Sequence, residues 1–318
     1  MKLNIRKSEQ IDARLLLCVW GIATALAAVL RTVQLFTNIE PHTGFFEAVD
    51  WSVYVMYGVL LAAVVLLAVL PAYSACLPAS RALVRKDQAL FFGSALFAVG
   101  LLYDAVLSVI NAAGTVSESG RLAVGALLFT EGLLAEVLQA VCGVLAAVYM
   151  GILAVSYLKG DARFTKYRFL ALTPLFWSMF RIVLRFMTKI SFTMVSELLQ
   201  ELAMLAFMML FLLSFARIAA QVNPRGEMRK LVCFGLPAAF LAAVIGISRL
   251  VCTVAGRGDL LADGFPFSFG EIGFVVFAVV YILEHMRFGR PASEEPQAEE
   301  NDTAADADVP DGEDSADA

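Results

Sequence analysis

The sequence predicts an all-α integral membrane protein with about eight transmembrane helices arranged as four helical hairpins. Its composition is 60% hydrophobic and 17% charged, with a mean hydropathy of +0.77, whereas soluble domains carry roughly 45–50% apolar and about 25% charged residues. Apolar runs of membrane length are separated by short polar loops, and basic residues gather in every second loop. The lipid bilayer is therefore the expected surrounding of most of the chain.

The apolar runs long enough to cross a membrane are expected at residues 15–37, 51–70, 89–110, 135–158, 169–189, 197–218, 231–254 and 267–286. Pro71 ends the second run, and Gly114 lies in the polar loop that follows the third. Pro174 and Pro237 fall in the inner thirds of the fifth and seventh helices. Neighbouring helices can accommodate such prolines, so they predict kinks within membrane-spanning helices.

The stretch 122–158 is too long for one membrane crossing. As a single helix it would extend about 55 Å at about 1.5 Å per residue, and the hydrocarbon core is about 30 Å thick. We therefore place the fourth helix at 135–158. Residues 122–134 are then either a short segment at the outer surface or an extension that protrudes from the membrane.

Orientation follows from the loops and chain ends. Seventeen Lys and Arg residues fall on one side of the predicted bundle, and three (Arg121, Lys189 and Arg257) fall on the other. Cytoplasmic loops carry the excess of basic residues. This distribution predicts both termini in the cytoplasm and eight crossings of the cell membrane.

Three regions follow from composition: a basic N-terminus (1–14), an eight-helix transmembrane domain (15–290) and an acidic tail (291–318). The tail holds eleven acidic residues and no basic or aromatic residue, so we expect it to be disordered. Removing these eleven from the 29 acids of the chain leaves 18 against 24 Lys and Arg, and the remainder is net positive. The tail suggests a basic cytoplasmic partner.

Motifs for cofactor, metal or nucleic-acid binding are not expected. The chain has five cysteines without a CxxC pair and two histidines far apart in the sequence, which argues against a disulfide framework or a His-based zinc site. It contains no P-loop, GxGxxG or HExxH sequence, and these are the motifs that would indicate nucleotide or metal chemistry.

A short pattern, [Arg/Asp]-x-Val-x-x-[Phe/Val], recurs in four helices that run outward. It begins at Arg31, Asp104, Arg181 and Arg249, with spacings of 73, 77 and 68 residues. Arg185 continues the face of Arg181 one turn later. The pattern predicts four parallel hairpin repeats, each with a charge in the middle or outer part of the membrane, where ionisable residues are costly and often functional.

Acidic residues lie near the outer end of each following helix. They are Asp50, Glu131, Glu136, Glu197, Glu201 and Glu271. The simplest pairing joins Arg31 to Asp50, Arg181 or Arg185 to Glu197 or Glu201, and Arg249 to Glu271. Asp104 breaks the series and could accept from an arginine of a neighbouring hairpin. Pairing would offset much of the cost of burying these charges.

Three interpretations of these charges remain open. They are clamps that fix the register of the helices, arginines that snorkel to the outer headgroups, or the lining of an outward-open cavity for a small anionic or zwitterionic ligand. The cavity predicts a transporter or permease-like bundle, a construction known with parallel repeats. The alternative is a non-transporting sensor or accessory subunit whose acidic tail contacts a partner.

An enzyme is the least favoured function. Tyr103-Asp104 and Gly256-Arg-Gly-Asp259 resemble the YD and GxGD signatures of intramembrane aspartyl proteases. That resemblance implies two aspartates sharing a proton to activate water. Here Asp259 falls in a predicted outer loop beside Arg257 instead of on a membrane helix, so we expect no enzymatic activity.

Overall fold

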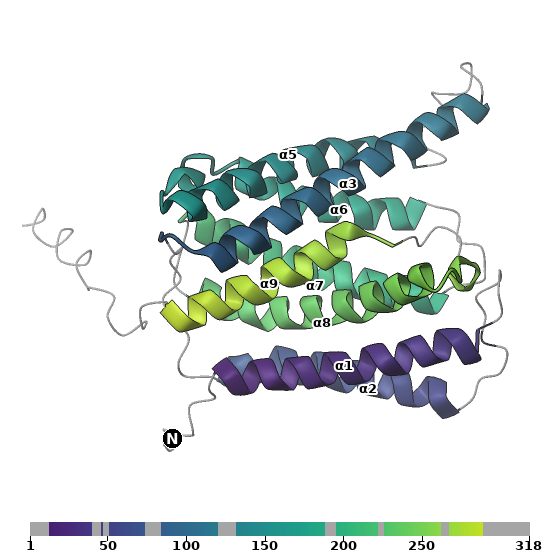
Figure 1. Ribbon diagram of the computed structural model, residues 1–318. Coiled ribbons are helices and arrows are strands. Elements are labelled where there is room, and N and C mark those ends of the chain that lie inside the picture. Colours follow the sequence, from purple (N-terminus) through teal and green to yellow (C-terminus); the bar gives the residue numbers. More distant parts are fainter. Residues whose placement is uncertain are drawn as a thin grey trace, which may run out of the picture.

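The computed structural model describes residues 13–39, 46, 51–73, 84–119, 132–187, 195–221, 226–261 and 267–288. Its α-helices are α1 (Ala13–Thr37), α2 (Trp51–Val69), α3 (Gln88–Ser119), α5 (Leu133–Lys159), α6 (Thr173–Met187), α7 (Val195–Ala219), α8 (Glu227–Val254) and α9 (Phe269–Phe288). Short 3-10 turns at Leu70–Tyr73, Arg163–Lys166, Leu170–Leu172 and Gly258–Leu260 join some of them. The helices lie roughly alongside one another, and α1 begins at the end of the bundle where α9 ends (Figure 1).

The predicted set of eight spans is confirmed, because the described part of the chain contains eight helices long and apolar enough to cross a membrane. The hairpin repeats and the cytoplasmic position of the termini stay predictions. The acidic tail, most of segment 122–134, Asp50 and Glu131 lie outside the described residues.

Three helix boundaries differ from the prediction by four residues or more, and one of them is the start of α8, which lies at Glu227 instead of residue 231. Helix α3 continues through Gly114 to Ser119, because Ala112 and Val116 pack against Leu133 at the start of α5. Helix α6 begins only at Thr173. Pro174 is therefore its second residue, where the missing N–H costs little, and the predicted kink within this helix is wrong. Helix α8, in contrast, continues through Pro237 as one helix.

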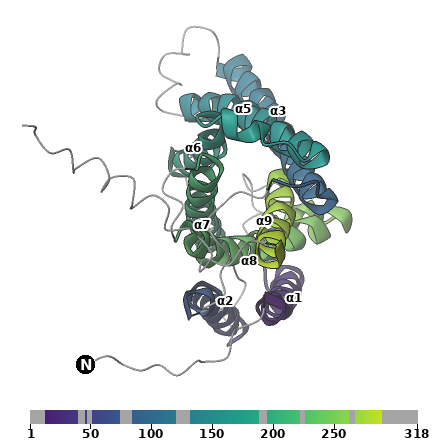
Figure 2. The same ribbon diagram turned by 90° about the vertical axis from the view of Figure 1, so that its left-hand side faces the viewer.

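Six helices form a closed ring. Seen end on, α3, α5, α6, α7, α8 and α9 follow one another around the bundle, and each contacts the next, with α9 returning to α3 (Figure 2). Helices α1 and α2 pack on each other and against α8 from outside this ring. Helix α8 is thus enclosed on both sides. In its apolar stretch of 18 residues, 83% of the residues are buried, against 28% in the corresponding stretches of α1 and α2.

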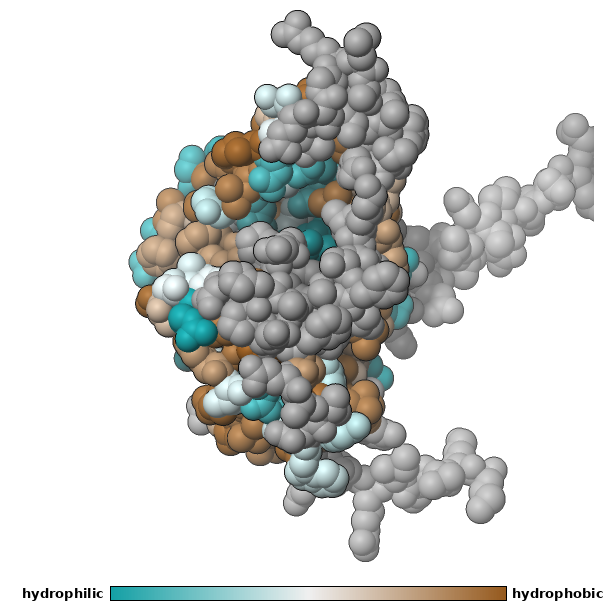
Figure 3. Space-filling model, turned by 90° about the vertical axis from the view of Figure 1, so that its right-hand side faces the viewer, coloured by the Kyte–Doolittle hydropathy of each residue, from teal (hydrophilic) through white to brown (hydrophobic). Residues whose placement is uncertain are grey.

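The outside of the bundle is apolar, as the bilayer requires. Large side chains such as Trp51, Ile22, Leu61 and Phe92 are exposed, which in lipid is the favourable arrangement. The end of the bundle at which α1 ends and α9 begins differs, because hydrophilic atoms appear there in a recess between apolar surfaces (Figure 3).

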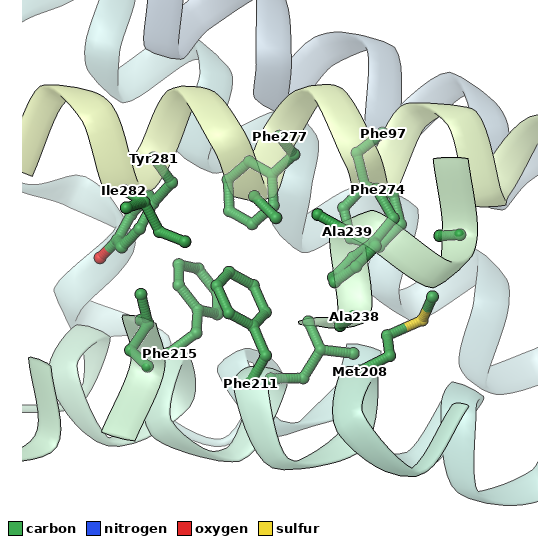
Figure 4. Packing of buried hydrophobic residues seen from close by; sticks show 14 of the residues in the cluster. Phe97, Met208, Phe211, Phe215, Ala238, Ala239, Phe274, Phe277, Tyr281 and Ile282 are labelled. Carbon is green, nitrogen blue, oxygen red and sulfur yellow. The ribbon is translucent and has the colours of Figure 1, made fainter. Parts of the chain in front are cut away.

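Aromatic side chains fill the interior of the ring. Every ring helix contributes a fully buried one: Phe97 (α3), Tyr149 (α5), Trp177 (α6), Phe211 and Phe215 (α7), Phe240 (α8), and Phe274 and Phe277 (α9). Phe211 and Phe215 point from α7 toward Phe277 and Tyr281 of α9 (Figure 4). Ring centroids lie 5.4 Å apart for Phe211 and Phe274 and for Phe215 and Phe277, within the range of favourable edge contacts. We call this set the aromatic floor.

Glycines allow α3 and α9 to touch backbone to backbone. A Cβ atom at Gly273 would lie 2.9 Å from the Leu96 carbonyl oxygen and from the Phe97 Cα, and one at Gly100 would lie 2.7 Å from the Phe269 carbonyl oxygen. No side chain fits at such distances, so glycine is required on both helices. The close approach brings the start of α9 against the middle of α3.

Candidate functional site

Eight charged side chains meet at the end of the ring where α7 and α9 begin and α8 ends. They are Arg31, Asp104, Arg181, Arg185, Glu197, Glu201, Arg249 and Glu271, and we call them the charged layer. All are buried except Arg185, which is partly buried. The layer draws on α1, α3, α6, α7, α8 and α9. Its members come together because the carboxylates open α7 and α9 while Arg31 and Arg249 lie near the ends of α1 and α8.

Glu201 is the carboxylate shared by the most arginines. Its Oε1 atom accepts from Arg185 Nε at 2.9 Å and from Arg181 Nη2 at 3.4 Å, and its Oε2 atom accepts from Arg249 Nη2 at 3.1 Å. Charge-assisted bonds of this kind are about twice as strong as neutral ones. One glutamate of α7 thereby joins α6 and α8.

Arg181 is the arginine that contacts the most carboxylates of the layer, namely Asp104, Glu201 and Glu271. Its Nη2 atom donates to Glu271 Oε1 at 2.5 Å, and its Nη1 atom lies 3.4 Å from Asp104 Oδ2. Its guanidinium carbon also lies 5.6 Å from the centre of the Trp177 ring, a favourable cation–π distance. The charged layer therefore rests directly on the aromatic floor.

Ser268 is a member of the site that the sequence reasoning missed. It precedes α9, and its hydroxyl oxygen accepts from the Glu271 N–H at 3.3 Å as a helix cap does. The same hydroxyl donates to Asp104 Oδ2 at 2.7 Å and lies 3.3 Å from Arg181 Nη1. The available signal was the sequence Ser268-Phe-Gly-Glu271, a capping-box pattern. Here the glutamate side chain turns to Arg181.

Helices α1 and α2, which pack outside the ring, are called the outer hairpin below. Arg31 connects this outer hairpin to the ring. Its Nη2 atom lies 2.7 Å from Glu197 Oε1 of α7. The predicted partner was Asp50, which lies outside the described residues. Among the described residues, the ion-pair partner of Arg31 therefore comes from α7 and not from the helix that follows α1.

Of the other charged residues predicted for the site, Asp104 and Arg249 belong to the charged layer, and Glu136 does not. Asp104 meets Arg181 of another hairpin, and Arg249 Nη1 lies 3.6 Å from Glu271 Oε1. Glu136 is half-buried in the first turn of α5 and, within the described ranges, has no ion pair with these arginines. Glu131 lies outside those ranges.

A small cavity borders the charged layer between α1, α7 and α8. Its lining is Arg31, Leu35, Glu197, Gln200, Ile245, Ser248 and Arg249, and its volume is about 10 Å³, room for about one water molecule. Gln200 and Ser248 were not predicted from the sequence. The charged side chains that line this cavity, Arg31, Glu197 and Arg249, are buried and form ion pairs.

Ionised, the layer is electrically balanced, with four guanidinium groups and four carboxylates. Removing such groups from water costs several kcal/mol per ion, and only close pairing repays it. Arginine suits this role because its planar group can serve two acceptors. In the described residues no cluster of three or more His, Cys, Asp or Glu could hold a metal ion.

A second polar region lies at the opposite end of the ring. There Glu227 of α8 accepts from Arg217 Nη1 at 3.1 Å and from Lys230 Nζ at 2.9 Å. Asp87 caps α3 by accepting from the Leu90 N–H at 3.3 Å and the Ala89 N–H at 2.9 Å. The aromatic floor separates this region from the charged layer.

Comparison of the chain with protein-family models, curated proteins and solved structures found no match. The fold itself defines the class: the eight apolar helices of the described residues make this chain a polytopic integral membrane protein.

Proposed function

We propose that the protein is a permease-like bundle that binds a small charged or zwitterionic solute at the charged layer and passes it across the membrane. The observation that carries this proposal is that Arg181 and Arg249 share the same two carboxylates, Glu201 and Glu271. Ionisable groups inside a membrane usually mark a solute or ion pathway.

Because Arg181 and Arg249 share their carboxylates, replacing one ion-pair partner by a solute costs little free energy. An incoming carboxylate or ammonium group that takes one member of a simple buried pair leaves the other charge uncompensated. In the charged layer, Glu201 and Glu271 each keep another arginine when one arginine is lost. The layer can therefore accept a polar solute without leaving a bare charge in a medium of low dielectric constant.

The layering of the ring supports the same function. A solute entering at the end of the ring where α7 and α9 begin would meet the charged layer first and the aromatic floor next. The floor would act as a barrier between this layer and the polar region around Glu227. A permeation pathway needs such a barrier, opened only in response to a bound solute.

A second candidate is a non-transporting receptor or accessory subunit. It is favoured by the rigid contact of α3 with α9 through Gly100 and Gly273 and by the ion pairs that tie five ring helices together. A receptor would bind the solute at the charged layer without releasing it on the other side.

Uptake into proteoliposomes tests the proposal. The full chain would be reconstituted and supplied with ¹⁴C-labelled glycine, alanine, γ-aminobutyrate or acetate. We expect saturable uptake of at least one solute, strongly reduced by Glu201→Gln and unchanged by Arg163→Ala, an exposed position. Binding without uptake would favour the receptor, and folded protein that neither binds nor transports any probe would contradict both functions.

A further inference from the structure

We propose that the cavity between α1, α7 and α8 is the binding subsite for a small zwitterion, with Arg31 and Gln200 facing its carboxylate and Glu197 facing its ammonium group. This inference rests on the proposed function, because it names the class of solute and where it binds. The three side chains lie among the residues that line the cavity.

Unsatisfied polar atoms point to a ligand here. Arg31 Nη1, Glu197 Oε2 and Gln200 Nε2 are buried and have no hydrogen-bond partner within the part of the chain that the structure describes. The residues are only 4%, 7% and 8% exposed. Buried polar groups in native proteins are nearly always satisfied, so three such atoms around one cavity form an arrangement that a polar ligand would complete.

The chemistry of these atoms selects the ligand. Arg31 and Gln200 offer N–H donors, which suit a carboxylate, and the free oxygen of Glu197 offers an acceptor, which suits a primary ammonium. The charged layer is already balanced, so a net-neutral ligand leaves it balanced, whereas a simple anion or cation would add an uncompensated buried charge. Leu35 and Ile245 complete the lining with apolar surface.

Entry to the site requires the outer hairpin to move. The cavity holds about one water molecule, so a ligand larger than water fits only after Arg31 and Glu197 separate. Helices α1 and α2 would move together, because Gln34 Nε2 donates to the Ser52 carbonyl at 2.8 Å and Asn38 Nδ2 to the Ser52 hydroxyl at 2.9 Å. The ligand would replace each member of the ion pair by its own opposite charge.

Thermal stabilisation of the full chain in a nonionic detergent tests the subsite. Glycine, β-alanine and γ-aminobutyrate vary the distance between the two charges, while acetate and methylamine each carry only one. We expect one or more zwitterions to raise the midpoint of unfolding, and neither single-charge probe to do so at equal concentration. An equal shift with acetate would overturn the assignment, and so would the absence of a shift both with these zwitterions and with a zwitterionic lipid.

The same zwitterionic chemistry occurs in the headgroup of phosphatidylethanolamine. Adding this lipid to the detergent-solubilised protein, with phosphatidylglycerol as the anionic comparison, separates the two sources. A shift with phosphatidylethanolamine alone would assign the subsite to a lipid headgroup, and a shift with the soluble zwitterion would assign it to a free solute. Equal shifts with both lipids would contradict recognition of a zwitterion.

Gln200→Met removes one donor without disturbing the ion pair, and Gln139→Met is the matched control. Gln139 is equally buried but hydrogen-bonds to Ser108, away from the cavity. Loss of one good hydrogen bond predicts about a tenfold rise in Kd for Gln200→Met and no change for the control. Uptake by wild-type proteoliposomes that Gln200→Met leaves intact would reject this subsite but keep the proposed function, and binding without uptake would do the reverse.

Discussion

Arg31 of α1 and Glu197 of α7 are separated by 166 positions in the sequence, yet their side chains form an ion pair at 2.7 Å. The pair joins the outer hairpin to a ring of six helices that is otherwise closed on itself. It also borders the cavity assigned to a zwitterion. The ion pair between α1 and α7 and the proposed binding of solute thus involve the same two groups.

The first prediction concerns the energetic coupling of this pair. Removing one partner leaves a buried charge, so Arg31→Met or Glu197→Met alone should each destabilise the protein by about 3–5 kcal/mol. The double variant removes both charges and should be more stable than either single one. A double-mutant cycle on thermal or denaturant unfolding in detergent measures this coupling.

The exposed pair Asp161–Arg163 supplies the comparison. Its side chains are separated by 3.2 Å but are 45% and 58% exposed, and such pairs contribute about 0–1 kcal/mol. If Arg31 and Glu197 show coupling as small as this exposed pair, they are not a buried pair, and the attachment of α1 to α7 is wrong.

The second prediction concerns a charge swap in the centre of the layer. Arg185→Glu combined with Glu201→Arg should not restore the stability lost in either single variant. A new arginine at 201 would face Arg181 and Arg249, both of which contact Glu201 in the structure. Monodisperse yield and Tm of the two single variants and the double variant provide the measurement; recovery in the double variant would show that Glu201 serves Arg185 alone.

The sequence was sufficient to locate the eight helices, because length and apolar composition alone decide whether a segment can span the bilayer. It also indicated that Arg181 and Arg185 share a face, since residues four apart lie together on a helix, and that Glu197 or Glu201 is the partner of one of them. It could not predict the partner of Arg31. Hairpin neighbours suggested Asp50, but the position of α1 outside the ring depends on side-chain packing around α8, and that packing is not visible in hydropathy.

The third prediction uses the close contact between α3 and α9. Gly273→Ala would place a Cβ atom 2.9 Å from the backbone of Leu96 and Phe97, so we expect a loss of about 1–3 kcal/mol from overpacking. Gly151→Ala in α5 is the control, because no atom lies within 4 Å of its added Cβ. There the gain in helix stability of about 0.5–1 kcal/mol should prevail. Unfolding of both variants under one condition tests the difference in sign.

The fourth prediction concerns Ser268, whose hydroxyl caps α9 and donates to Asp104. Ser268→Ala removes both interactions and leaves a buried carboxylate with one donor fewer, at a cost of about 1–3 kcal/mol. Ser268→Thr retains a hydroxyl and should retain much of the stability. Ser94→Ala is the matched control, since the buried Ser94 hydroxyl donates only to carbonyl groups of its own helix. If Ser268→Ala lowers Tm no more than Ser94→Ala, then Ser268 does not organise the charged layer.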